Sequence, residues 1–119
     1  MLLKDLIVYK KLCRLTLEVH KMSMLFPKFE MYELGSQIRR SSNSVAANLA
    51  EGFGNKHTNI YTECISRSQG EIRETIHHLE IAQAKNYIAG KESEKLTLEY
   101  IECSKMLYGL EKSLEKKKS

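Results

Sequence analysis

Apolar and small residues recur at alternating intervals of four and three in four separate segments of this 119-residue chain. That spacing places each set on one stripe of an α-helix. Four such helices joined by short connections predict an all-α fold, an antiparallel up-down-up-down four-helix bundle. The stripe positions are Val8, Leu12, Leu15, Val19, Met22 and Phe26; Leu34, Ile38, Ser42, Val45 and Leu49; Tyr61, Ile65, Ser68, Ile72, Thr75, Leu79 and Ala82; and Leu96, Tyr100, Cys103, Leu107, Leu110 and Leu114.

Three short breaks separate the segments. The first, at residues 26–29, holds the only proline of the chain, which cannot continue a helix. The second, at 52–57, holds two glycines, and the third, at 86–90, ends on a glycine. We therefore expect one domain over residues 1–119, with helices at roughly 4–25, 30–52, 57–86 and 91–116. One proline and six glycines are too few for a sandwich or barrel, which needs a turn about every 8–12 residues.

The net charge of +4 is concentrated in the first half of the chain. Residues 1–59 hold nine Lys or Arg and five Asp or Glu, whereas residues 60–119 hold ten of each. An anionic partner is therefore expected to contact the first half, or the lysine tail at 116–118. The alternative is that these charges are ordinary solvated helix faces. The candidate nucleic-acid contacts lie on the first helix and are Lys10, Lys11, Arg14 and Lys21. The six tyrosines are dispersed, so we expect contacts to backbone or shape rather than to splayed bases.

The three cysteines suit a reducing compartment. Cys13, Cys64 and Cys103 form no Cys-x-x-Cys pair and leave one unpaired in any disulfide scheme. Charged residues interrupt the apolar residues near the amino terminus, and no stretch approaches 18 apolar residues. We expect a cytoplasmic protein with no membrane partner.

Motifs for catalysis are not found. Glu74 and His77 match the Glu-x-x-His spacing of di-iron bundles, but a second such pair, which those sites require, does not occur. The chain has no His-Glu-x-x-His, no P-loop and no Gly-x-Gly-x-x-Gly, and its serines and histidines suggest no catalytic triad. We expect no enzyme activity and no catalytic, cofactor-binding or metal site.

Surplus apolar residues lie beside the core stripes of the first and fourth helices. A four-helix core needs one stripe per helix, so a second row indicates either self-association or a wide core stripe. These residues are Leu6, Tyr9, Cys13, Leu17 and Met24 on the first helix, with Leu98 and Ile101 on the fourth.

The second helix combines small side chains with an unusual polar set. Small residues allow helix axes to approach closely, and the polar residues beside them predict a hydrogen-bond network, either inside the bundle or at an interface. The polar residues are Gln37, Arg39, Arg40, Ser44, Asn48 and Glu51.

The same helix resembles a known signature. Residues 36–52 read SQIRRSSNSVAANLAEG, which is similar to the run S-Q-I-R-R-A-A-x-S-I-P-A-N-I-A-E-G of the bacterial four-helix-bundle family, also called the 23S rRNA intervening-sequence protein family. Phe26-Pro27-Lys28 resembles the junction before that run, and 70–74, 78–82 and 87–88 resemble the third helix of the family. Ala46 stands where the family has proline, Ser41-Ser42 replaces an alanine pair and Glu71 replaces a serine.

The resemblance implies a four-helix protomer that assembles into a ring-like homopentamer. A distant relative, the accessory variability determinant of diversity-generating retroelements, forms a similar basic barrel that binds reverse transcriptase and nucleic acid. Members encoded within rRNA genes imply an association with RNA. No catalytic residues carry over, and the polar residues of the second helix carry over only as structural or interface residues.

These observations lead to one functional hypothesis and one alternative. The first is a non-enzymatic, oligomeric, ribosome-associated helical protein that binds structured RNA or a nucleoprotein through a basic face. The alternative is a protein–protein scaffold with no role in nucleic-acid binding.

Overall fold

A computed structural model describes residues 1–118, and for Lys118 the backbone alone. The side chain of Lys118 and all of Ser119, which belong to the expected domain and lysine tail, therefore lie outside the described residues. The chain forms four long helices, α1 (Ile7–Ser23), α2 (Leu34–Gly52), α3 (Thr58–Ala84) and α4 (Gly90–Lys118), with no strand among the described residues. Two short 3₁₀ helices, η1 (Leu3–Asp5) and η2 (Lys28–Glu30), precede α1 and α2.

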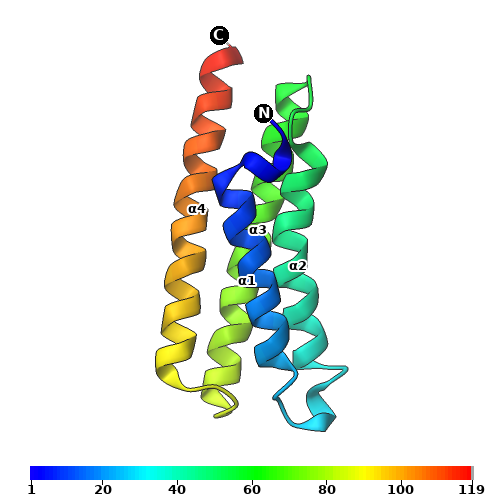
Figure 1. Cartoon of the computed structure of the whole chain (residues 1–119), viewed down its shortest axis with the longest axis vertical. Coiled ribbons are helices and arrows are strands. Elements are labelled where there is room, and N and C mark those ends of the chain that lie inside the picture. Colours follow the sequence, from blue (N-terminus) through cyan, green and yellow to red (C-terminus); the bar gives the residue numbers. More distant parts are fainter. Residues whose placement is uncertain (119) are drawn as a thin grey trace.

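The helices alternate in direction and enclose a single core (Figure 1). Each helix packs against the next one along the chain, and α4 returns to pack against α1. The resulting body measures 50 × 24 × 21 Å. The predicted all-α antiparallel bundle is confirmed. No helix within residues 1–118 is long and apolar enough to cross a membrane.

The core consists of the stripe positions that the periodicity predicts. All of them are buried except Leu110 and Leu114, which are half-buried. α4 has 29 residues and α1 has 17, so the last turns of α4 extend past the start of α1 and have less to pack against (Figure 1). The extra half-buried residues Leu6, Tyr9 and Cys13 pack on the edge of this core.

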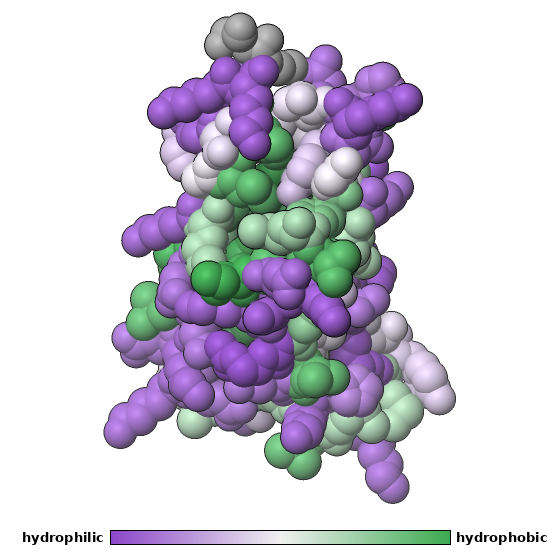
Figure 2. Space-filling model, turned by 45° about the horizontal axis from the view of Figure 1, so that its top comes forward, coloured by the Kyte–Doolittle hydropathy of each residue, from purple (hydrophilic) through white to green (hydrophobic). Residues whose placement is uncertain are grey.

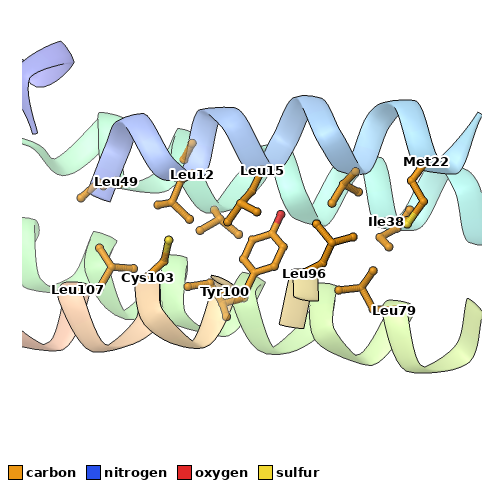
Figure 3. Close-up of a cluster of buried hydrophobic side chains, with 14 of the residues drawn as sticks. Leu12, Leu15, Met22, Ile38, Leu49, Leu79, Leu96, Tyr100, Cys103 and Leu107 are labelled. Carbon is orange, nitrogen blue, oxygen red and sulfur yellow. The ribbon is translucent and has the colours of Figure 1, made fainter. Parts of the chain in front are cut away.

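Tyr100 lies at the centre of the core. The side chain is fully buried, and its hydroxyl points toward α1 beside Leu15 (Figure 3). This hydroxyl has no hydrogen-bond partner. Burial raises the pKa of the phenol well above its ordinary value, with smaller contributions from Cys103, Glu18 and Glu99. The orphaned hydroxyl is a cost to stability within an otherwise apolar layer.

Left-handed backbone conformations mark the two later breaks. Gly54, after α2, has φ of +72°, and Asn86, after α3, has φ of +63°. Glycine adopts this region without steric penalty, and asparagine tolerates it better than other residues. The α3 terminus is closed by hydrogen bonds from Asn86 N to Gln83 O and from Tyr87 N to Ala82 O, both 2.9 Å long.

The first junction is longer than the sequence indicates. The expected first helix over 4–25 is shorter at both ends, and the expected start of the second helix at residue 30 is four residues too early. Glu30 lies in η2, and its carboxylate is drawn into the end of the bundle. The chain therefore spends residues 31–33 in a turn before α2 can begin.

Candidate functional site

α2 and α3 approach closely because small side chains line their contact. A Cβ atom added to Gly52 would lie 2.5 Å from Cys64 Cβ, so only glycine fits there. Ser41 Oγ and Thr75 Oγ1 share a buried hydrogen bond of 2.8 Å, and Ser68 Oγ donates to the carbonyl oxygen of Val45 at 2.8 Å. The serines of this contact thus satisfy their hydroxyls inside the bundle.

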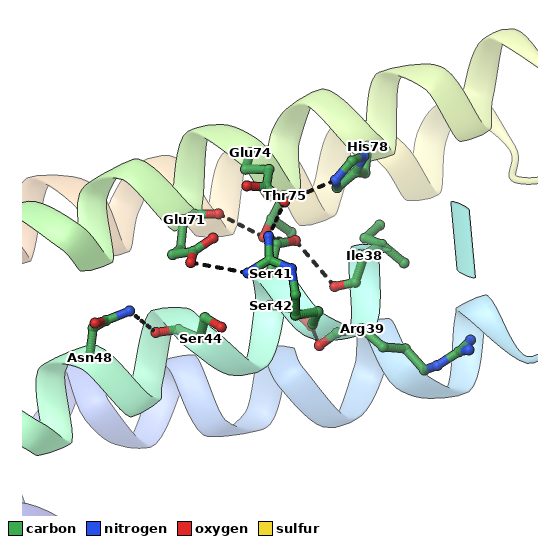
Figure 4. Close-up of polar contacts among 11 residues, drawn as sticks. Ile38, Arg39, Ser41, Ser42, Ser44, Asn48, Glu71, Glu74, Thr75 and His78 are labelled. Carbon is green, nitrogen blue, oxygen red and sulfur yellow. Dashed lines mark hydrogen bonds and ion pairs between the residues drawn. The ribbon is translucent and has the colours of Figure 1, made fainter. Parts of the chain in front are cut away.

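Arg40 links α2 to α3 through two carboxylates (Figure 4). Its guanidinium donates to Glu71 at 3.3 Å and to Glu74, and Glu74 also bonds His78 Nε2 at 3.2 Å. Burial raises the pKa of Glu74, but the hydrogen bonds from Arg40 and His78 outweigh it, so the net shift is downward. Arg40 is therefore part of an intramolecular ion-pair network.

Arg39 points away from that network, toward the α1–α2 junction (Figure 4). Its Nη1 donates to Ser23 Oγ at 3.1 Å, and its Nη2 donates to the carbonyl oxygen of Met31 at 2.6 Å. Gly35 gives this side chain room, since a Cβ atom there would lie 2.9 Å from Arg39 Nη1 and 2.8 Å from Glu30 O. Arg39 thus ties the end of α1 and the following turn to α2.

The other polar residues of α2 reach no neighbouring helix. Asn48 Nδ2 donates to the carbonyl oxygen of Ser44 within α2 at 2.8 Å, and both residues are half-buried. Gln37 and Glu51 are exposed to solvent. The predicted network therefore divides into buried contacts, the two arginines, and side chains that stay available at the surface.

The four candidate basic contacts on α1 differ in their surroundings. Lys11 pairs with Glu102 of α4, and Arg14 bonds Glu18 at 3.0 Å and Glu99 at 3.2 Å. The hydrogen bond to Glu102 raises the pKa of Lys11. Such exposed pairs add little stability, but they offset much of the positive field of these two residues.

Lys10 and Lys21 are exposed, and neither forms an ion pair within the described part of the chain. They are eleven residues apart on one helix, or about 16 Å along its axis. The accessible positive charge of α1 is thus narrower than the sequence indicates.

The surplus apolar row of α1 borders an open groove. Tyr9, Cys13 and Leu17 face α2 residues across a hollow of about 350 Å³, and Leu17 is 66% exposed. On α4, Leu98 and Ile101 are also exposed, and Met24 is exposed beyond the end of α1. Elsewhere the surface is mostly hydrophilic, with hydrophobic side chains gathered near the end that holds the amino terminus (Figure 2). Of the two readings of this row, a wide core stripe does not account for Leu17.

Two features of the α1–α2 junction were missed from the sequence. The first is the buried Glu30, which accepts hydrogen bonds from Tyr87 OH at 2.7 Å and Lys85 Nζ at 3.0 Å. The Tyr87 and Lys85 hydrogen bonds lower the pKa of Glu30 despite its burial. The second is the exposure of Phe29 and Tyr32. Their position beside the lone proline was the available signal, since apolar residues in a break have no helical stripe to join.

The structure shows no arrangement suited to a metal. Glu74 is engaged by Arg40 and His78, and the neighbouring His77 is exposed. Within the described residues no group of three or more His, Cys, Asp or Glu side chains could hold a metal ion.

A sequence model described as 23S rRNA-intervening sequence protein matches residues 4–109, which include all of α1, α2 and α3 and most of α4. The chain belongs to the 23S rRNA-intervening sequence protein family. The resemblance carried by residues 36–52 is thereby confirmed. Neither this family nor the structural relative described next indicates an enzymatic activity.

A solved structure shares the fold of this family member. It is a protein of unknown function from the S23 ribosomal protein family of Bacteroides thetaiotaomicron, 20% identical, with a TM-score of 0.82 over 89% of this chain and 96% of that chain. None of the curated proteins compared with the chain matches it.

Proposed function

We propose that this protein is a non-enzymatic, ribosome-associated homo-oligomer that binds structured RNA or a nucleoprotein through the α1 face. The observation that carries the proposal is the exposure of Lys10 and Lys21 without carboxylate partners, in a member of a family described by its link to 23S rRNA. Two cations about 16 Å apart suit two separate phosphates of one nucleic acid. The proposed site of action is the cytoplasm, and the three free cysteines agree with it.

Self-association completes the proposed function. Two lysines per chain bind weakly, whereas a ring of five copies presents the same pair five times and multiplies the effective affinity. The proposed contact between copies is the groove beside Leu17, which leaves apolar area uncovered in the single chain. We expect light scattering to give a mass near five times 13.7 kDa, and a stable monomer would contradict this assembly.

Filter binding to structured rRNA over a salt series tests the proposal. We expect micromolar or tighter affinity that falls steeply as salt increases, because phosphate contacts release counterions. The double variant Lys10→Ala/Lys21→Ala should weaken binding and reduce the salt slope by about one for each lost contact in a protomer. A matched control is Lys91→Ala/Lys105→Ala, which removes two exposed lysines of α4. Absence of binding at low salt would overturn the RNA-binding part.

The alternative of a protein scaffold rests on the same uncovered apolar surface. It predicts that the purified oligomer binds a protein partner with unchanged affinity after nuclease treatment. Arg39 does not distinguish the two, because its contacts are with Ser23 and Met31 of its own chain. We therefore expect Arg39→Ala to impair folding or assembly more than RNA contact.

A further inference from the structure

The turn between α1 and α2 presents two aromatic side chains to solvent. Tyr32 is 87% exposed and Phe29 is 71% exposed, which is unusual for large rings on a single domain. The turn is held by hydrogen bonds between residues three apart, from Glu30 N to Pro27 O, Met31 N to Lys28 O and Glu33 N to Glu30 O. In that geometry side chains three residues apart project to the same side, so Phe29 and Tyr32 share one face of the turn.

The turn is rigid because other residues hold it from within. Glu30, between the two rings in sequence, is buried and bonded to Tyr87 and Lys85, while Arg39 holds the carbonyl of Met31. The rings are therefore displayed on an anchored backbone rather than on a loose loop. Preorganisation of this kind lowers the entropy lost on binding.

A small hollow lies next to the exposed rings. Its volume is about 150 Å³, and it is bounded by the apolar side chains of Met24, Pro27 and Met31 and by the cations Lys28 and Arg39. Apolar walls with cations at the rim suit a flat, apolar-faced group that is linked to a negative charge.

The charges of the turn favour an anionic partner. Lys28 is exposed and forms no ion pair with any described residue. The carboxylate of Glu30 is buried and neutralised by Lys85, and the exposed Glu33 lies close enough to Lys85 to raise the pKa of that lysine. The side that carries the rings is therefore left with uncompensated positive charge.

We propose that this turn, residues 27–32, is a stacking platform for one or two unpaired nucleotides of an RNA strand. Phe29 and Tyr32 stack on base faces, and Lys28 contacts an adjacent phosphate. The proposal rests on the proposed RNA-binding function and makes it more specific, since it names single-stranded loops or bulges as the bound element. It also differs from the expectation that contacts are to backbone and shape alone.

A tryptophan introduced at position 32 provides the direct test. The chain contains no tryptophan, so Tyr32→Trp gives an emission signal from the platform alone. We expect a ten-nucleotide single-stranded RNA to quench this emission, and a blunt duplex of the same sequence to leave it nearly unchanged. Quenching by anionic lipid vesicles but not by the single strand would overturn the proposal.

Matched variants separate stacking from general attraction. Phe29→Leu and Tyr32→Leu keep apolar bulk but remove a ring, and each should weaken single-strand binding by about tenfold. Tyr32→Phe keeps the ring and should bind as the wild type does. Leu25→Ala is the control, because Leu25 lies near the same end of α1, is 84% exposed and has no ring. All four positions are exposed, so folding should be unaffected, as circular dichroism would verify.

The outcomes also separate this proposal from the one on which it rests. If structured RNA binds and both leucine variants bind the single strand as tightly as the wild type, the platform is wrong and the proposed function stands. If no RNA binds at all, both are wrong.

Discussion

Two tyrosine hydroxyls have opposite consequences at the scale of single residues. The hydroxyl of Tyr100 is buried without a partner, whereas that of Tyr87 donates to Glu30 at 2.7 Å. Tyr100→Phe should raise the free energy of unfolding by about 1 kcal/mol, because it removes an unsatisfied polar group. Tyr87→Phe should lower the Tm by a few degrees, because it leaves the carboxylate of Glu30 with one donor fewer. Thermal denaturation of both variants tests the pair, and a lower Tm for Tyr100→Phe would contradict the assignment.

Glu30 also makes a prediction about acid. Hydrogen bonds from Tyr87 and Lys85 place the pKa of Glu30 below its ordinary value of 4.5. The stabilisation from this carboxylate is therefore complete above the unfolded pKa and is lost as pH falls through the folded pKa. The Tm of Glu30→Gln should lie below that of the wild type at pH 7, and the gap should narrow between pH 5 and pH 3. A gap that stays constant over this range would contradict the ion pair.

At the scale of helices, two glycines should respond oppositely to the same substitution. A Cβ atom on Gly52 would overlap Cys64, so Gly52→Ala should force α2 and α3 apart and cost about 2 kcal/mol. Gly109 lies in α4 with no atom within 4 Å of the added carbon, so Gly109→Ala should stabilise the helix by about 0.5–1 kcal/mol. Urea denaturation measures both. Equal effects would mean that helix propensity, and not the close α2–α3 contact, dominates at Gly52.

At the scale of the whole molecule, the uncovered groove beside Leu17 predicts how assembly can be disrupted. Leu17→Glu places a charge on the proposed contact and should shift the oligomer to smaller species in light scattering, while the helical content is unchanged. Leu2→Glu is the matched control, since Leu2 is similarly exposed at 61% and lies outside the α1 row. An oligomer of unchanged mass in the Leu17 variant would place the contact elsewhere on the molecule.

The sequence alone determined the helices and their arrangement. Periodicity is a local property, so Val8 through Phe26 already predict one buried stripe, and Pro27, Gly54 and Asn86 lie where the chain must turn. The signature at residues 36–52 likewise identified the family. The start of α2 was not predictable, because it depends on Glu30 reaching Lys85 and Tyr87, more than fifty residues away.

Only the tertiary structure decided which charges remain available. Sequence reasoning treated the α1 cations alike, but packing places Lys11 and Arg14 against Glu102 and Glu99 of α4, some ninety residues further along the chain. It also directs Arg39 and Arg40, adjacent in the chain, to different helices. Pairing across helices depends on distances in space that spacing along one helix does not contain. For the same reason, the exposure of Phe29 and Tyr32 emerged only once the bundle had formed around them.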